Sequence, residues 1–126
     1  MFVPGKLRIL IADDERIIAD TLAMILNHNG YDAFPVYGGQ LAVEKARRWR
    51  PDLFVADVSM PELDGVQAAI EICAMVPECR VLLFSGEASS RILVRAAGFK
   101  GHRFEFIQKP IPPLDLLSRI RHLRAA

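Results

Sequence analysis

The stretch RPDLFVADVSMPELDG, residues 50–65, joins a short apolar run to an acidic loop that contains a proline. The run from Leu53 to Ala56 is apolar at every position, which is typical of a strand buried on both faces of a sheet. Asp57 follows at the end of this predicted strand. In an α/β fold, functional side chains gather beyond the carboxyl ends of the strands, and Asp57 is therefore the first candidate for chemistry.

Predicted strands and helices alternate outward from this stretch along the whole chain. Gly30 is expected to end the first helix, and Pro35 is expected to place its strand at a sheet edge, because proline has no N–H to donate. Five strand–helix pairs predict the α/β class, with a doubly wound, five-stranded parallel sheet covered by helices on both faces. The expected strands span residues 7–12, 31–36, 53–56, 81–84 and 104–107, and the expected helices about 17–26, 40–49, 66–75, 89–97 and 114–123.

The composition favours one globular domain. The chain has 126 residues, of which 52% are apolar and 25% charged. It contains neither an apolar run long enough to span a membrane nor a recognisable secretory signal, so we expect a cytoplasmic protein without a membrane partner. We expect a single domain over residues 1–126, with a core at about 6–124. Cys73 is expected to be a buried thiol, and neither a disulfide with Cys79 nor a zinc site is expected.

Charge is unevenly distributed along the chain. The net charge is +1, yet residues 91–126 contain eight Lys or Arg residues and only two Asp or Glu residues. Such a cationic segment can attract nucleic acid or an acidic protein, but it is more often a solvated face. No motif that combines basic and aromatic residues accompanies it, so we expect no direct nucleic-acid binding.

Polar residues follow four of the predicted strands: Asp13 and Asp14 the first, Asp57 the third, Ser85 the fourth and Lys109 the fifth. Each alone is a common turn, cap or surface residue. In a parallel sheet these positions meet at one edge. Three carboxylates placed together repel one another and need a cation, and oxygen ligands without His or Cys indicate Mg²⁺. A carboxylate is also a competent nucleophile toward phosphorus, and Mg²⁺ and a lysine supply the positive charge that phosphoryl transfer needs.

Residues 50–65 resemble the signature region of bacterial response-regulator receiver domains. The Asp-x-x-Met-Pro-x-x-Asp-Gly core is intact at residues 57–65, and Asp13-Asp14, Ser85 and Lys109-Pro110 occur in the family's order and approximate spacing. The resemblance covers nearly the whole chain. It implies a flavodoxin-like (βα)5 fold and a two-component signalling function in which a phosphohistidine donor phosphorylates the chain.

The resemblance also implies a role for each site residue. Asp57 would be the phosphoacceptor. Asp14 and Asp57 would ligate Mg²⁺ directly, together with the backbone carbonyl of Ser59, and Asp13 would act largely through water. Lys109 would pair with the phosphoryl oxygens, across a cis bond to Pro110.

Ser85 and Phe106 would form the switch that reports phosphorylation. In the family the hydroxyl residue moves toward the phosphoryl group, and the aromatic residue turns inward behind it. The alternative for Phe106 is a strand residue that is simply buried in the core. Ser59 and Glu87 occupy positions that influence how quickly water removes the phosphoryl group. The basic segment 98–103 departs from the family pattern, which puts the usual dimer in doubt.

The expected partners are a sensor histidine kinase or phosphotransfer protein and, downstream, a protein target or an output domain missing from this chain. The final helix ends close to the last residue, so the chain is expected to be a stand-alone receiver or a receiver from a longer protein. Two alternatives remain. A phosphate-ester hydrolase would place an acid two residues after its nucleophile, where this chain has Ser59. A phosphorylation-independent binding module would be favoured by loss of Asp57, Asp14 or Lys109, all of which are present.

Overall fold

A computed structural model of the protein describes residues 6–86 and 104–125. The alternation of strands and helices is confirmed there, with bounds within two residues of those predicted. The predicted helix at 89–97 lies outside the described residues. The elements are β1 (Arg8–Ala12), α1 (Arg16–His28), β2 (Asp32–Val36), α2 (Gly39–Trp49), β3 (Leu53–Asp57), α3 (Gly65–Met75), β4 (Arg80–Ser85), β5 (Phe104–Gln108) and α5 (Pro113–Ala125).

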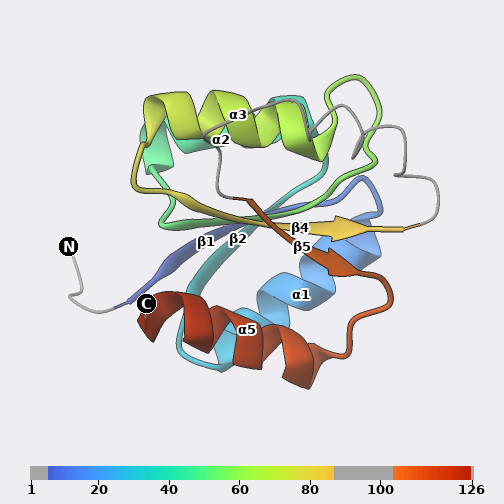
Figure 1. The fold of residues 1–126 in the computed structure, drawn as a ribbon, viewed down its shortest axis with the longest axis vertical. Coiled ribbons are helices and arrows are strands. Elements are labelled where there is room, and N and C mark those ends of the chain that lie inside the picture. Colours follow the sequence, from blue (N-terminus) through green and yellow to red (C-terminus); the bar gives the residue numbers. More distant parts are fainter. Residues whose placement is uncertain (1–5, 87–103, 126) are drawn as a thin grey trace.

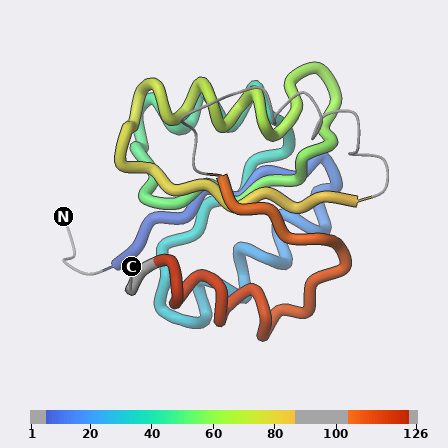
Figure 2. Tube along the Cα trace, viewed as in Figure 1, coloured from blue at the N-terminus to red at the C-terminus, as the bar shows by residue number. Residues whose placement is uncertain are grey.

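The five strands form one parallel sheet in the order β2-β1-β3-β4-β5. Helices α2 and α3 lie on one face of the sheet, and α1 and α5 lie on the other (Figures 1 and 2). This arrangement is the doubly wound α/β fold that the sequence predicts. β2 is an edge strand, as Pro35 predicted, and β1, β3 and β4 are interior strands.

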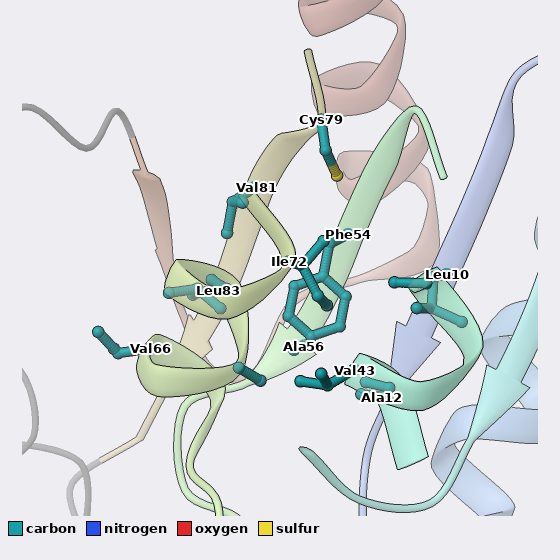
Figure 3. Packing of buried hydrophobic residues seen from close by; sticks show 14 of the residues in the cluster. Leu10, Ala12, Val43, Phe54, Ala56, Val66, Ile72, Cys79, Val81 and Leu83 are labelled. Atoms are coloured by element: carbon teal, nitrogen blue, oxygen red, sulfur yellow. The ribbon is translucent and has the colours of Figure 1, made fainter. Parts of the chain in front are cut away.

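Alternate residues of the central strands feed two separate hydrophobic cores. On the α2–α3 side, Leu10, Phe54 and Leu83 are fully buried and pack with Ile72 of α3, as Figure 3 shows. On the α1–α5 side the core is built by the intervening strand residues with α1 and α5 side chains, namely Ile9, Ile11, Leu53, Val55, Leu82, Phe84, Leu26, Leu116 and Ile120. β1 and β3 are thereby packed between two apolar layers, and this packing holds the ends of the two strands in fixed positions.

Local signals set the starts and ends of the helices. α1 is followed by Gly30, which adopts a left-handed backbone with φ of +91°, the conformation that glycine supplies most readily. α3 is capped by Asp64, whose Oδ1 accepts a hydrogen bond from the Gln67 N–H at 2.8 Å. The position of Gly30 at the end of α1 is the one predicted from the sequence.

The two cysteines are free thiols, as predicted. Cys79 is buried in the core on the α2–α3 side, whereas Cys73 is only half-buried, so the prediction that Cys73 is buried is wrong. Cys73 packs against this core as a partly buried side chain of α3. Burial raises the pKa of both thiols, which keeps them in the less reactive protonated form.

Gly65 lies against the strand that carries Asp57. Its N–H donates a hydrogen bond to the Val58 carbonyl at 2.9 Å, and a Cβ at this position would collide with the backbone carbonyl oxygen of Asp57. Glycine is therefore required here by the close approach of two backbone segments. The start of α3 is packed directly onto the end of β3.

Replacing Gly65 with alanine should destabilise the protein by about 1–3 kcal/mol, because the new methyl group meets backbone that cannot move aside. Gly38→Ala is the matched control, since a Cβ there meets no atom within 4 Å. Urea unfolding of the two variants and the wild type measures the difference. Equal stability of the two variants would contradict the close-approach argument.

Candidate functional site

The polar residues singled out in the sequence lie at one edge of the sheet. Asp13 and Asp14 follow β1, Asp57 is the last residue of β3, Ser85 is the last residue of β4, and Lys109 follows β5. Because all five strands are parallel, these positions share the carboxyl edge. The predicted convergence is confirmed as a placement in the fold.

Asp57 contacts two of the other predicted residues. Its Oδ2 accepts a hydrogen bond from Lys109 Nζ at 2.7 Å, and the same contact is an ion pair. Its Oδ1 accepts a hydrogen bond from the Ser59 N–H at 3.1 Å. The Asp57 carboxylate is thus held by one donor from the loop after β3 and by one from the loop after the edge strand β5.

Asp13, Asp14 and Asp57 form a compact acidic cluster. Each offers a carboxylate oxygen such that the three atoms lie within 4.8 Å of one another. Asp13 and Asp57 are buried, and Asp14 is exposed to solvent. Three hard oxygen donors of this kind, open to solvent on one side, suit a divalent cation such as Mg²⁺ or Ca²⁺ better than a soft metal.

The carboxylate of Asp13 is incompletely satisfied. Its Oδ1 accepts a hydrogen bond from the Glu15 N–H at 2.9 Å, whereas its Oδ2 is buried without a hydrogen-bond partner. A buried, unpartnered carboxylate oxygen is costly, and it therefore calls for a cation or water as its partner. This orphaned oxygen is independent support that the cluster fits a metal ion.

Burial and neighbouring charges change the proton affinity of the site. Desolvation, assisted by the charge of Asp57, raises the pKa of Asp13 from 3.8 to about 6, although the hydrogen bond from the Glu15 amide opposes the change. Burial alone would lower the pKa of Lys109, but the hydrogen bond and charge of Asp57 outweigh burial and raise it. Lys109 therefore remains a cation beside Asp57 over the whole physiological pH range.

Ser85 is joined to the site through the backbone, because its carbonyl accepts a hydrogen bond from the Lys109 N–H at 2.8 Å. The Lys109-Pro110 bond is cis, as the resemblance implied. Phe106 has 39% of its surface exposed, so in this structure it is not buried in the core. Glu87 and segment 98–103 lie outside the described residues.

Sequence reasoning missed a group of side chains beside the acidic loop. Tyr37 directly follows β2, its hydroxyl donates a hydrogen bond to Asp20 Oδ1 at 2.6 Å, and the Arg16 guanidinium lies 4.3 Å from the centre of its ring. No motif signals these contacts, because they join segments about 20 residues apart. The available signal was positional, since Tyr37 follows a strand at the same edge as Asp13.

The sequence and the fold both match a known family. The family model described as the response regulator receiver domain matches residues 9–121. The chain belongs to this family. Response regulator MprA from Mycobacterium leprae is 33% identical over 117 residues, which cover 93% of this receiver domain and 50% of MprA. The chain therefore spans about half the length of that curated relative.

Solved receiver domains have the same fold. The signal receiver domain of a signal transduction histidine kinase from Syntrophus aciditrophicus superposes with a TM-score of 0.81 and 31% identity, over 94% of this chain and 90% of that one. A two-component transcriptional regulator, AraC, from Clostridium phytofermentans gives a TM-score of 0.79 with 29% identity, over 93% and 92% of the two chains. The protein is thus a receiver domain of the two-component response-regulator class, with the expected flavodoxin-like fold.

Within residues 6–86 and 104–125 of the receiver domain, no helix has both the length and the apolar character needed to cross a bilayer.

Asp13→Asn should stabilise the metal-free receiver domain near neutral pH by about 1–3 kcal/mol, because it removes a buried, poorly partnered charge. The folded state holds the Asp13 proton more tightly than the unfolded state. The wild type therefore loses stability as pH rises from about 4 to about 6, and the variant lacks this loss. Denaturant unfolding in EDTA at several pH values measures the effect. A stability difference that does not change with pH would contradict it.

Proposed function

We propose that Asp57 accepts a phosphoryl group from a phosphohistidine donor with the help of Mg²⁺. The observation that carries this proposal is the combination of a buried carboxylate, a lysine 2.7 Å away and two further carboxylates at the same edge of the sheet. An Asp57 oxygen forms a bond to phosphorus while the phosphorus–nitrogen bond of the donor breaks. The electron pair of that bond leaves with the imidazole, and the product is an aspartyl phosphate.

The chain's own residues prepare the carboxylate for this reaction. Lys109 and the Ser59 N–H each occupy one Asp57 oxygen, which orients the carboxylate and favours its ionised form. Asp14, Asp57 and the Ser59 backbone carbonyl are the proposed Mg²⁺ ligands, with Asp13 acting mainly through water. When bound, Mg²⁺ would supply positive charge that screens the carboxylates from the incoming phosphoryl oxygens. Lys109 is placed to pair with those oxygens once they arrive.

Ser85 and Phe106 are the proposed switch. Leu83 and Ser85 of β4 pair with Phe106 and Gln108 of β5, so the two switch residues lie on adjoining strands, two positions apart in register. Phe106 is partly exposed in this structure, as the unphosphorylated arrangement of the proposal requires. An inward turn would bury the exposed part of the Phe106 ring and stabilise the inward state by about 1 kcal/mol. New contacts of Ser85 would be strong enough to shift an equilibrium of this size.

Exposed apolar side chains on α1 and α5, two helices that begin near the carboxyl edge of the sheet, suit contact with a protein donor. Ile17 and Met24 of α1 and Leu114 of α5 expose 81%, 71% and 78% of their surfaces. Ile17 and Met24 lie two helical turns apart on one face of α1, and α1 contacts α5. We infer that this surface receives a helical histidine kinase or phosphotransfer protein. The phosphorylated state would then act on a protein target or on an output domain of a longer chain.

The proposal extends to the bounds of the domain and to its cellular location. We infer that one receiver domain occupies about residues 6–124, which is supported by the family match over residues 9–121. We also infer a cytoplasmic location, where the two free thiols would remain reduced. Ser59, two residues after Asp57, is not an acid and so cannot protonate a leaving group, which disfavours a phosphate-ester hydrolase.

Incubation with acetyl phosphate or phosphoramidate and Mg²⁺ should add one phosphoryl group to the wild type. Asp57→Asn or excess EDTA should prevent the addition, because the nucleophile or the cation is then missing. Intact-protein mass spectrometry measures the result. No addition from either donor in a folded chain that binds Mg²⁺ would favour the phosphorylation-independent binding module instead.

Lys109→Ala should separate metal binding from phosphoryl acceptance. Removing the cation beside Asp57 leaves the acidic cluster more negative, so Mg²⁺ affinity should be unchanged or higher. Acceptance from acetyl phosphate should slow by about tenfold or more, because a fixed positive charge is lost where phosphoryl oxygens arrive. Calorimetric Mg²⁺ titration and time-resolved mass spectrometry test the two halves. An unchanged rate of acceptance would exclude a role for Lys109 in the reaction.

A further inference from the structure

Tyr37 holds two residues at the start of α1 with one side chain. Its hydroxyl donates a hydrogen bond to Asp20 Oδ1 at 2.6 Å, and its ring lies 4.3 Å from the Arg16 guanidinium carbon. Arg16 and Asp20 are four positions apart on α1 and therefore share one helical face. The short hydrogen bond to Asp20 raises the pKa of Tyr37, so the hydroxyl keeps the proton that it donates.

The start of α1 is supported locally by the hydrogen bond that the Glu15 N–H donates to Asp13 Oδ1 at 2.9 Å, but it lacks a side-chain cap. Glu15 at the N-cap position makes no side-chain capping hydrogen bond, and the first turn contains no acidic residue. Arg16 instead places a positive charge near the positive end of the helix dipole, which is unfavourable without a partner. The ring of Tyr37 supplies that partner through a cation–π contact.

The same end of β2 is bonded to the acidic loop. The Asp13 N–H donates a hydrogen bond to the carbonyl of Val36, the residue before Tyr37, at 3.2 Å. Residues 36 and 37 therefore contact both ends of the acidic loop. Val36 binds its backbone at Asp13, and Tyr37 binds the first turns of α1, which follow Glu15. Asp14 lies between these two attachments and is exposed, so its direction depends on the loop backbone rather than on packing of its own side chain.

We propose that Tyr37 is a positioning residue for the cation site and that it acts by fixing the first turn of α1 and, through it, Asp14. The inference rests on the metal-binding part of the proposed function. Residues that orient metal ligands commonly change affinity tenfold or more when they are removed. Tyr37 acts through the backbone, so loss of its side-chain contacts should weaken Mg²⁺ binding by about three- to tenfold.

The test compares Tyr37→Leu, which removes both contacts, with Tyr37→Phe, which keeps the ring beneath Arg16 and removes only the hydroxyl. Phe34→Leu is the matched control, because Phe34 is an exposed aromatic residue of the preceding strand β2 with its own cation–π contact, 3.9 Å from Lys45 Nζ. Mg²⁺ affinity is measured by calorimetry, the Asp14 and Glu15 amides are followed by NMR during the titration, and thermal unfolding is recorded for each variant.

Tyr37→Leu should weaken Mg²⁺ binding, Tyr37→Phe should weaken it less, and Phe34→Leu should leave it unchanged at a comparable loss of stability. Unchanged affinity in Tyr37→Leu, or an equal loss in Phe34→Leu, overturns the inference. A wild type that binds no Mg²⁺ overturns both this inference and the metal part of the proposed function. A wild type that binds Mg²⁺ but accepts no phosphoryl group overturns only phosphoryl acceptance.

Discussion

Three carboxylates are held at the ends of two neighbouring strands, β1 and β3, against their mutual repulsion. Their oxygens lie within 4.8 Å of one another, and Lys109 is the cation that contacts Asp57. This arrangement persists because β1 and β3 are interior strands, buried beneath an apolar core on each face. Hydrophobic burial over the whole sheet thus supports an unfavourable concentration of charge at one edge, where a cation and an anionic ligand can later bind.

The loop after β3 is fixed by backbone contacts. The Gly65 N–H bonds the Val58 carbonyl across the loop, and a side chain at Gly39 would collide with the Leu63 carbonyl, so the start of α2 touches the loop from the other side. Residues 58–64 are therefore confined between the first turns of α2 and α3. The Ser59 N–H that orients Asp57 is consequently held in place by the fold, without any contribution from the Ser59 side chain.

The β2 edge of the sheet is closed to further strand pairing by two local devices. Asn27 of α1 bonds both the N–H and the carbonyl of Ala33, at 2.7 and 3.0 Å, and Pro35 has no N–H to offer. A second strand would have to displace Asn27 and would still find no donor at Pro35. The receiver domain is thus protected at this edge of the sheet from pairing with other chains.

The sequence was sufficient for features that depend on local patterns. Apolar runs such as Leu53 to Ala56 predicted the interior strands, Pro35 predicted an edge strand, and parallel topology then predicted the convergence of Asp13, Asp57 and Lys109. Contacts between exposed side chains could not be predicted in this way. The Tyr37–Asp20 bond joins two surface residues whose types fit many environments, and only the folded backbone shows that they meet. The partial exposure of Phe106 likewise depends on packing that hydrophobic patterning does not determine.

Lys109 connects the acidic site to the proposed switch by two separate hydrogen bonds. Its Nζ donates to Asp57, and its backbone N–H donates to the carbonyl of Ser85, the residue whose hydroxyl is proposed to move. A phosphoryl group on Asp57 would attract the ammonium toward its oxygens and remove the present ion pair. In the proposed switch, the backbone bond would transmit part of this displacement to the end of β4. It would then reach Phe106, because β4 and β5 are paired in register from Val81 to Ser85. The proposed route from β3 to the aromatic ring on the edge strand β5 thus needs one side chain and one peptide hydrogen bond.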